Sequence, residues 1–96
     1  MQTEDNIPED KEQDRSQYVA EAASYVTPYF KPALDRRGAT DLFTTHEVWQ
    51  SIVRLNPNTN VSEGDVFTML EEHCFLYQPD DTLLSLEYKW LMVRIR

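Results

Sequence analysis

Apolar residues spaced three and four positions apart mark three segments of this chain, at 16–30, 44–56 and 62–74. This spacing places the apolar side chains on one face of a helix and leaves polar side chains on the other face. After residue 75 the pattern changes to an alternation of apolar and other residues, which is typical of a strand. We therefore predict three amphipathic helices followed by a β-ribbon.

Local signals define the ends of the second and third helices. Thr44 and Glu47 match the capping-box pattern, in which each side chain accepts a hydrogen bond from a backbone amide at a helix start. The Asn56-Pro57 pair stops the second helix, because both residues favour a turn over a further helical residue. Ser62 provides another N-cap, and the acids that follow it lie at the positive end of the helix dipole.

The first helix is expected to begin with Ser16 as its N-cap and to run towards Phe30. Pro28 can distort its last turn, and Pro32 should stop it. Each proline lacks the amide hydrogen of the helical ladder and disfavours helical geometry in the residue before it. The residues at 35–39 should then form a surface loop.

The segment 75–95 predicts a β-hairpin with its turn at 79–82, where a proline and two aspartates come together. The returning strand is longer than the outgoing one, so part of its backbone needs another hydrogen-bond partner. Residues 41–44 can supply a short third strand within the chain. The alternative is a strand-mediated homodimer, but we favour a monomer because closure within one chain carries no concentration term.

The aromatic residues are expected to lie mainly in the core, because each ring removes about 150 to 250 Å² from water when it is buried. A chain of 96 residues provides one domain with a modest core. The expected core aromatics are Trp49, Trp90, Tyr88, Phe43, Phe67 and Phe75.

This order of elements resembles the winged helix-turn-helix superfamily over about residues 16–96. The resemblance rests on the two capped helices, the short strand before them and the hairpin after them, and it points to no particular family. It implies an α+β fold: a small three-helix domain with a C-terminal β-hairpin wing and a third short strand at 41–44. It also implies that the helix after Ser62 occupies the position that enters a DNA groove in such domains.

The charge of that helix argues against ordinary DNA binding. It carries several acids and neither lysine nor arginine, and Asp80 and Asp81 lie at the expected wing tip. Carboxylates repel the phosphate backbone, whose contacts provide most of the sequence-independent affinity of DNA-binding proteins. We therefore predict that the solvent side of this helix contacts a protein. The candidate residues are Glu63, Asp65, Thr68, Glu71 and Glu72.

Two alternatives use the charges differently. A DNA-binding regulator would need an atypical basic face or a dimer, and its candidate contacts are Arg36, Arg37, Arg54 and Lys89. An acidic DNA mimic would use the formal charge of −8 to occupy the groove of a DNA-binding protein. Convergence of the four bases would favour the first alternative, whereas scattered bases favour the protein-binding interpretation.

Residues 1–15 are expected to form a disordered acidic arm before the domain at 16–96. The arm contains six acids, two bases and only two aliphatic residues, so it has little apolar surface to offset the entropy of ordering. The sequence shows no basic start followed by an apolar run, and its longest apolar runs have four residues. We therefore expect no membrane association and a cytoplasmic location.

No set of residues predicts catalysis, a metal or a cofactor. Cys74 is the only cysteine, and we expect it at the end of a buried helix. Its neighbour His73 would point about 100° away from it on a helix, and His46 is distant in sequence, so these ligands do not form a metal pattern. Gly38 and Gly64 are too few for a glycine-rich phosphate loop. The sequence predicts a non-enzymatic binding module whose protein partner it does not identify.

Overall fold

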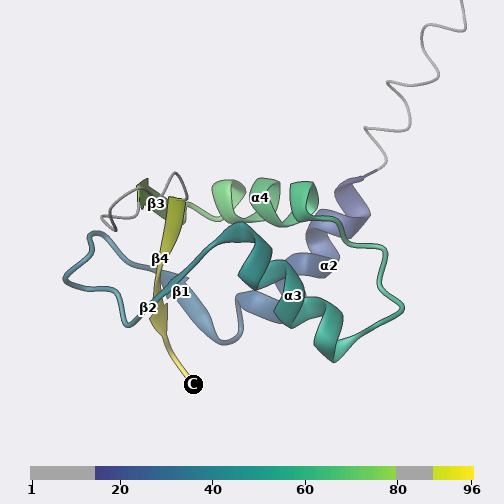
Figure 1. The fold of residues 1–96 in the computed structure, drawn as a ribbon, viewed down its shortest axis with the longest axis horizontal. Coiled ribbons are helices and arrows are strands. Elements are labelled where there is room, and N and C mark those ends of the chain that lie inside the picture. Colours follow the sequence, from purple (N-terminus) through teal and green to yellow (C-terminus); the bar gives the residue numbers. More distant parts are fainter. Residues whose placement is uncertain (1–14, 80–87) are drawn as a thin grey trace, which may run out of the picture.

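The computed structural model describes residues 15–79 and 88–96, which form three helices and four strands (Figure 1). The helices pack together beside an antiparallel sheet, so the domain is a small α+β fold. Residues 1–14 of the predicted arm and the tip of the predicted turn, Asp80 and Asp81, lie outside the described residues. In chain order the elements are α2 (Ser16–Val26), β1 (Phe30–Pro32), β2 (Asp41–Phe43), α3 (Thr45–Leu55), α4 (Glu63–Glu72), β3 (Leu76–Pro79) and β4 (Tyr88–Arg94).

Helix α2 differs from its prediction at both ends. Its N-cap is Arg15 rather than Ser16, and no side chain makes the capping bond. The amide of Thr27 donates to the carbonyl of Ala23, but Pro28 has no amide hydrogen with which to add the next bond. The helix therefore ends one turn before the predicted position, and the following residues enter the sheet.

Helices α3 and α4 begin where the sequence predicted. The hydroxyl of Thr44 accepts a hydrogen bond from the amide of Glu47 at 3.0 Å, and the Glu47 carboxylate accepts one from the amide of Thr44 at 2.9 Å. Ser62 and Asp65 make the same reciprocal pair of bonds at the start of α4. Helix α3 ends with Asn56 as its C-cap. The capping predictions are confirmed.

Strand β4 is the centre of the sheet. Strands β1 and β2 flank it, and β3 pairs with its first half, all in antiparallel orientation. The antiparallel pairing of β3 with β4 confirms the two predicted strands of the ribbon, and β2 confirms the short strand predicted at 41–44. Pro79, which was predicted in the turn, is the last residue of β3, and the rest of the predicted turn lies outside the described residues. Strand β1 was not predicted; it pairs Phe30 with Arg94 at the end of β4. The long returning strand thus obtains its partners within the chain.

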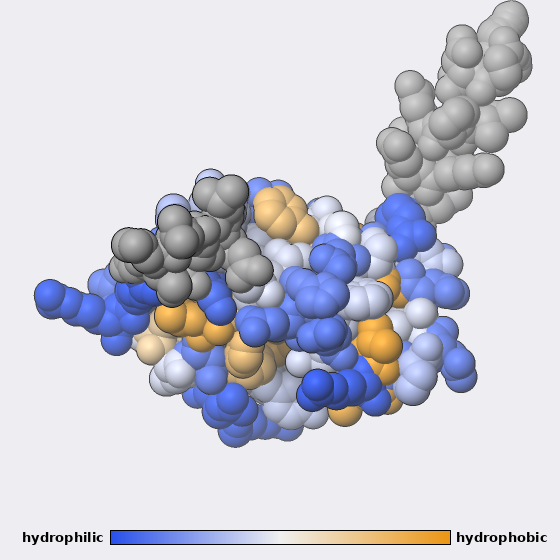
Figure 2. Space-filling model, in the orientation of Figure 1, coloured by the Kyte–Doolittle hydropathy of each residue, from blue (hydrophilic) through white to orange (hydrophobic). Residues whose placement is uncertain are grey.

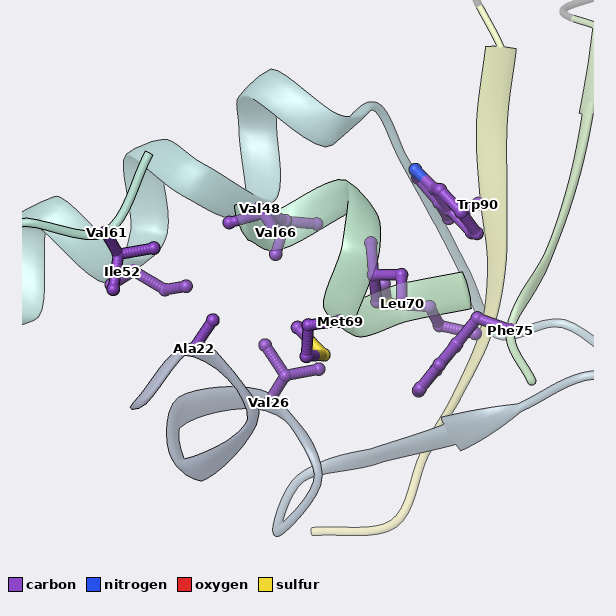
Figure 3. Packing of buried hydrophobic residues seen from close by; sticks show 11 residues of the cluster. Ala22, Val26, Val48, Ile52, Val61, Val66, Met69, Leu70, Phe75 and Trp90 are labelled. Carbon is purple, nitrogen blue, oxygen red and sulfur yellow. The ribbon is translucent and has the colours of Figure 1, made fainter. Parts of the chain in front are cut away.

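The core lies between the three helices and β4 (Figure 3). Met69 and Leu70 of α4 are fully buried, and Ile52 of α3 and Trp90 of β4 are each 1% exposed. Helix α4 packs against both α2 and α3, so its buried side chains fill the centre of the domain. Within the described ranges, no helix has the length and apolar character needed to cross a bilayer.

Several side chains predicted in the interior lie elsewhere. Trp90 and Phe75 are buried as expected, but Phe67 and Tyr88 are 36% and 54% exposed. Cys74 is also exposed, with a φ of 67° at the point where the chain turns from α4 into β3. The core placement of Phe67 and Tyr88 and the buried environment of Cys74 were therefore wrong. The two exposed rings become important for the candidate site. Trp49 and Phe43 are half-buried and pack against the core.

Candidate functional site

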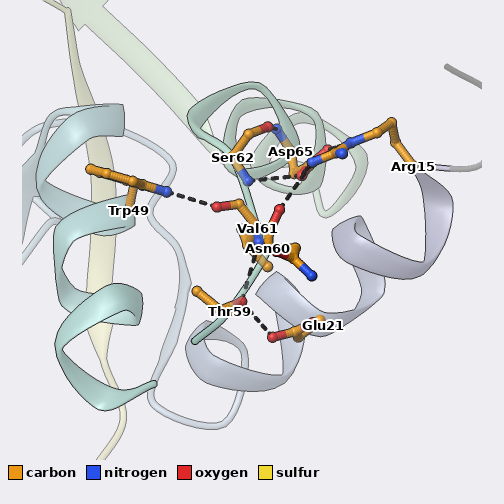
Figure 4. A network of polar contacts seen from close by, with 8 residues as sticks. All are labelled: Arg15, Glu21, Trp49, Thr59, Asn60, Val61, Ser62 and Asp65. Carbon is orange, nitrogen blue, oxygen red and sulfur yellow. Dashed lines mark hydrogen bonds and ion pairs between the residues drawn. The ribbon is translucent and has the colours of Figure 1, made fainter. Parts of the chain in front are cut away.

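Asp65, one of the predicted contact residues, is buried and only 4% exposed. Its carboxylate accepts hydrogen bonds from Nε of Arg15 at 3.1 Å, from a second Arg15 nitrogen, and from the amide of Ser62 at 2.8 Å (Figure 4). Arg15 also donates to the carbonyl of Asn60 at 3.1 Å. These bonds link the N-terminal end of α2 to the start of α4. The prediction that Asp65 faces solvent was therefore wrong, and Arg15, predicted in the arm, contacts the domain.

The environment of Asp65 favours its charged form. Burial alone would raise the pKa of this carboxyl, because desolvation disfavours the anion. Hydrogen bonds from Arg15 and Ser62, together with the positive charge of Arg15, more than offset that effect and hold the pKa of Asp65 below its ordinary value. The hydrogen bond to Asp65 in turn raises the pKa of Arg15.

The lowered pKa of Asp65 predicts a specific loss of stability in acid. Its contribution to the free energy of unfolding should be complete above the pKa of the unfolded chain, about 3.9, and should be lost as the pH falls through the lower folded value. Between about pH 5 and pH 3, urea denaturation should therefore show a larger loss for the natural chain than for Asp65→Asn. Equal losses of the free energy of unfolding in the two chains would mean that protonation of Asp65 is not coupled to folding.

The other predicted contact residues lie on two different stripes of α4. Glu63 and Glu71 are exposed and four residues away from Phe67 on either side, so these three side chains share one stripe. Thr68 and Glu72 are exposed on a neighbouring stripe and line a groove of about 740 Å³ between α4 and α2. The predicted surface is therefore not continuous, because the buried face of the helix takes Asp65 and the groove takes two further residues.

Phe67 belongs to a group of four rings that we call the aromatic patch: Phe67, Tyr77, Tyr88 and Trp90. Tyr77 is 41% exposed and lies directly opposite Trp90 in the register, and Tyr88 is two residues before Trp90. The three rings of the ribbon therefore lie on one face, which is the face that meets α4. Buried Trp90 holds the group in place, because its indole nitrogen donates to the Thr45 hydroxyl at 2.8 Å.

The aromatic patch lines a hollow of about 440 Å³ at the junction of α3, α4 and the ribbon. Its other described walls are Thr44, Thr45 and His46. Nδ1 of His46 lies 2.7 Å from a carboxylate oxygen of Glu63, and its ring is 5.6 Å from that of Trp49. The hollow thus combines exposed aromatic surface with a carboxylate at its border.

The four bases proposed as DNA contacts do not all come together. Arg36 and Arg37 lie in the loop between β1 and β2, whereas Arg54 lies in the last turn of α3. Figure 1 shows that this loop and the end of α3 are on opposite sides of the domain. Lys89 lies on β4, half-buried, with its ammonium 3.8 Å from the carboxylate of Glu47. The structure therefore does not assemble these four bases into one continuous basic face.

The described residues carry balanced charges, with eight acids and eight bases. The net charge of −8 thus comes from residues 1–14 and 80–87. Figure 2 shows a mostly hydrophilic face interrupted by small, separate hydrophobic areas. Net charge therefore does not mark a site on the described part of the molecule, whereas the aromatic patch does stand out as a group of exposed rings.

The described residues contain no group of three or more histidine, cysteine or acidic side chains placed to hold a metal ion. His73 is the C-cap of α4, and its Nδ1 lies 3.0 Å from the carbonyl of Met69 rather than beside a second ligand. The groups that the hollow does offer to a ligand are its rings and the hydroxyls of Thr44 and Thr45.

Comparison with known proteins yields no match to a protein-family model, to a curated protein or to a solved structure.

The aromatic patch was not predicted, because Phe67, Tyr88 and Trp90 were expected in the core and Tyr77 was placed only in the alternating segment after residue 75. A signal was nevertheless present in the ribbon: Tyr88 and Trp90 alternate on one face of their strand, and Tyr77 lies opposite Trp90 on the same face. Phe67 could not be separated from the core face by periodicity, because it directly follows buried Val66 on α4.

Proposed function

We propose that this protein is a non-enzymatic winged-helix module that binds another protein through the aromatic patch. The strand and helix order supports the winged-helix interpretation: α2, then β2, the capped helices α3 and α4, and a hairpin whose second strand pairs with β2. In such domains α4 corresponds to the helix that faces a ligand. The observation that carries the proposal is the exposed ring surface of Phe67, Tyr77 and Tyr88 beside that helix.

Exposed aromatic side chains support protein binding over binding to DNA. Tyrosine and phenylalanine are enriched in protein interfaces, where a rigid ring buries a large area at a low cost in conformational entropy. DNA binding by α4 would place Glu63, Glu71 and Glu72 near phosphates, without a lysine or arginine on the helix to neutralise them. The aromatic patch and the acids of α4 thus point to the same class of partner.

The test is capture of a partner by the full chain and by a patch variant. The natural chain should capture a partner from a lysate of the cells that produce this protein. The Phe67→Ala/Tyr77→Ala variant should capture at least about tenfold less of that partner, because hot-spot aromatics contribute about 2 kcal/mol or more each. Leu34→Ala is the control, since Leu34 is 90% exposed and lies in the β1–β2 loop. Captured proteins that do not distinguish the patch variant from the control would contradict the proposal.

A titration with duplex DNA at low salt tests the same proposal from the other side. We expect no saturable binding up to about 100 µM, because the phosphate backbone meets an acidic α4 and dispersed bases. Saturable binding that weakens with salt would instead support the DNA-binding regulator. A captured partner that DNA competes away would support the acidic DNA mimic.

A further inference from the structure

The rings of the aromatic patch form corners rather than stacks. The ring planes of Tyr77 and Tyr88 meet at 75° with centroids 5.4 Å apart, and those of Tyr77 and Trp90 meet at 69° with centroids 4.7 Å apart. Phe67 meets Trp90 at 72°. Such contacts place the edge of one ring against the face of another, and the exposed area of Phe67, Tyr77 and Tyr88 leaves ring surface on which a cation can lie.

The charge around the hollow has the same sign as the ring faces. Glu63 and Glu71 lie one turn before and one turn after the lining residue Phe67 on the same stripe of α4, and the Glu63 carboxylate is 2.7 Å from Nδ1 of the lining residue His46. Among the described residues, the lining includes neither lysine nor arginine; His46 is the one basic ring and already contacts Glu63. An acceptor-rich aromatic hollow of this kind lacks a cation of its own in the described structure.

We infer that the aromatic patch receives an arginine side chain from a basic, partly apolar segment of the partner protein. This inference rests on the proposed function and names the partner's chemistry. A guanidinium is planar, stacks on ring faces and donates several hydrogen bonds to a carboxylate, so it matches rings bordered by Glu63 better than an ammonium does. The chain itself uses this contact elsewhere: the guanidinium of Arg15 lies 4.4 Å from the ring centroid of Tyr18, and that of Arg94 lies 5.1 Å from the centroid of Phe30.

Charge complementarity decides between the possible occupants. An acidic segment would meet the carboxylates of Glu63 and Glu71, and a second copy of this chain would bring the same acidic stripe to the interface. A purely aliphatic segment would bury the rings but would bring no positive charge to the acidic stripe. A segment that combines arginine with apolar residues satisfies both parts of the surface.

The experiment is a selection of random heptapeptides on the immobilised full chain, with Phe67→Ala/Tyr77→Ala as the counter-selection. We expect peptides that require the natural patch and that contain arginine more often than the starting library. Patch-dependent peptides without enrichment of arginine would overturn this inference and leave the proposed function standing. A selection that yields no patch-dependent peptide would overturn both. Enrichment of lysine equal to that of arginine would overturn the preference for a guanidinium.

Matched variants of peptide and protein then locate the cation. Replacing the selected arginine by citrulline keeps its shape and removes its charge, and this should weaken binding about tenfold, as expected for a partly desolvated cation on aromatic rings with a carboxylate nearby. Glu63→Gln/Glu71→Gln should remove most of that difference, whereas Glu72→Gln, on the stripe that faces the α2 groove, should preserve it. Equal binding of the arginine and citrulline peptides would overturn the assignment, and circular dichroism of each variant verifies that it is folded.

Discussion

The free energy of unfolding should fall by about 3 to 5 kcal/mol when Trp90 is replaced by alanine. Trp90 is 1% exposed, contacts the rings of Phe67 and Tyr77, and donates to the hydroxyl of Thr45. Its removal leaves a cavity at the junction of α3, α4 and the ribbon and takes the donor from Thr45. Urea denaturation followed by circular dichroism measures the loss.

The control for this prediction is Tyr88→Ala. Tyr88 lies two residues before Trp90 on the same strand, but it is 54% exposed. Its replacement should cost about 1 kcal/mol or less, because an exposed side chain loses little buried area when it is shortened. If Trp90→Ala lowered the free energy of unfolding no more than Tyr88→Ala does, the prediction that buried Trp90 stabilises this junction would be wrong.

Replacing Asp65 by alanine should lower the free energy of unfolding by about 2 to 3 kcal/mol. The substitution removes the acceptor for the amide of Ser62 and for the guanidinium of Arg15, so both the start of α4 and its link to α2 are weakened. Glu72→Ala is the matched control, because it removes the same charge from an exposed position of the same helix and should change the free energy by about 0.5 kcal/mol or less.

A double-mutant cycle separates the link to α2 from the helix cap. Arg15→Ala should destabilise the natural chain clearly more than it destabilises the Asp65→Ala variant, because its acceptor is already missing in the latter. An equal effect of Arg15→Ala in both backgrounds would show that the contact between Arg15 and Asp65 contributes nothing to folding.

Sequence reasoning predicted the elements whose signals are local. The Thr44–Glu47 capping pair lies within four residues, so a pattern search sees both partners at once, and the Ser62 cap is recognised from its position just before a helical pattern. The paired strands of the ribbon followed from the alternation after residue 75, and the strand at 41–44 followed from counting backbone groups, because the long returning strand needed a partner. In these cases the local sequence pattern favours the same conformation that the complete fold requires.

The failures occur where a distant partner determines the result. Asp65 follows a cap and has the polar character of the solvent side, but Arg15, fifty positions earlier, makes its burial favourable. Strand β1 forms because β4 supplies its hydrogen bonds, and its own sequence, Phe-Lys-Pro, carries no strong strand signal. The candidate site was predicted only in part: Glu63 and Glu71 share a stripe with Phe67, but Phe67 itself and two rings of the ribbon, Tyr88 and Trp90, were assigned to the core.

The central position of β4 determines how backbone hydrogens should exchange with deuterium. Every described pairing of the sheet includes β4, and none joins two of the other strands. Opening β4 therefore breaks all the cross-strand bonds together, so protected amides in the middle of this strand should exchange only through unfolding of the whole domain. The three-residue strand β1 can detach from one end of β4 alone, and its amides should report a smaller, local opening.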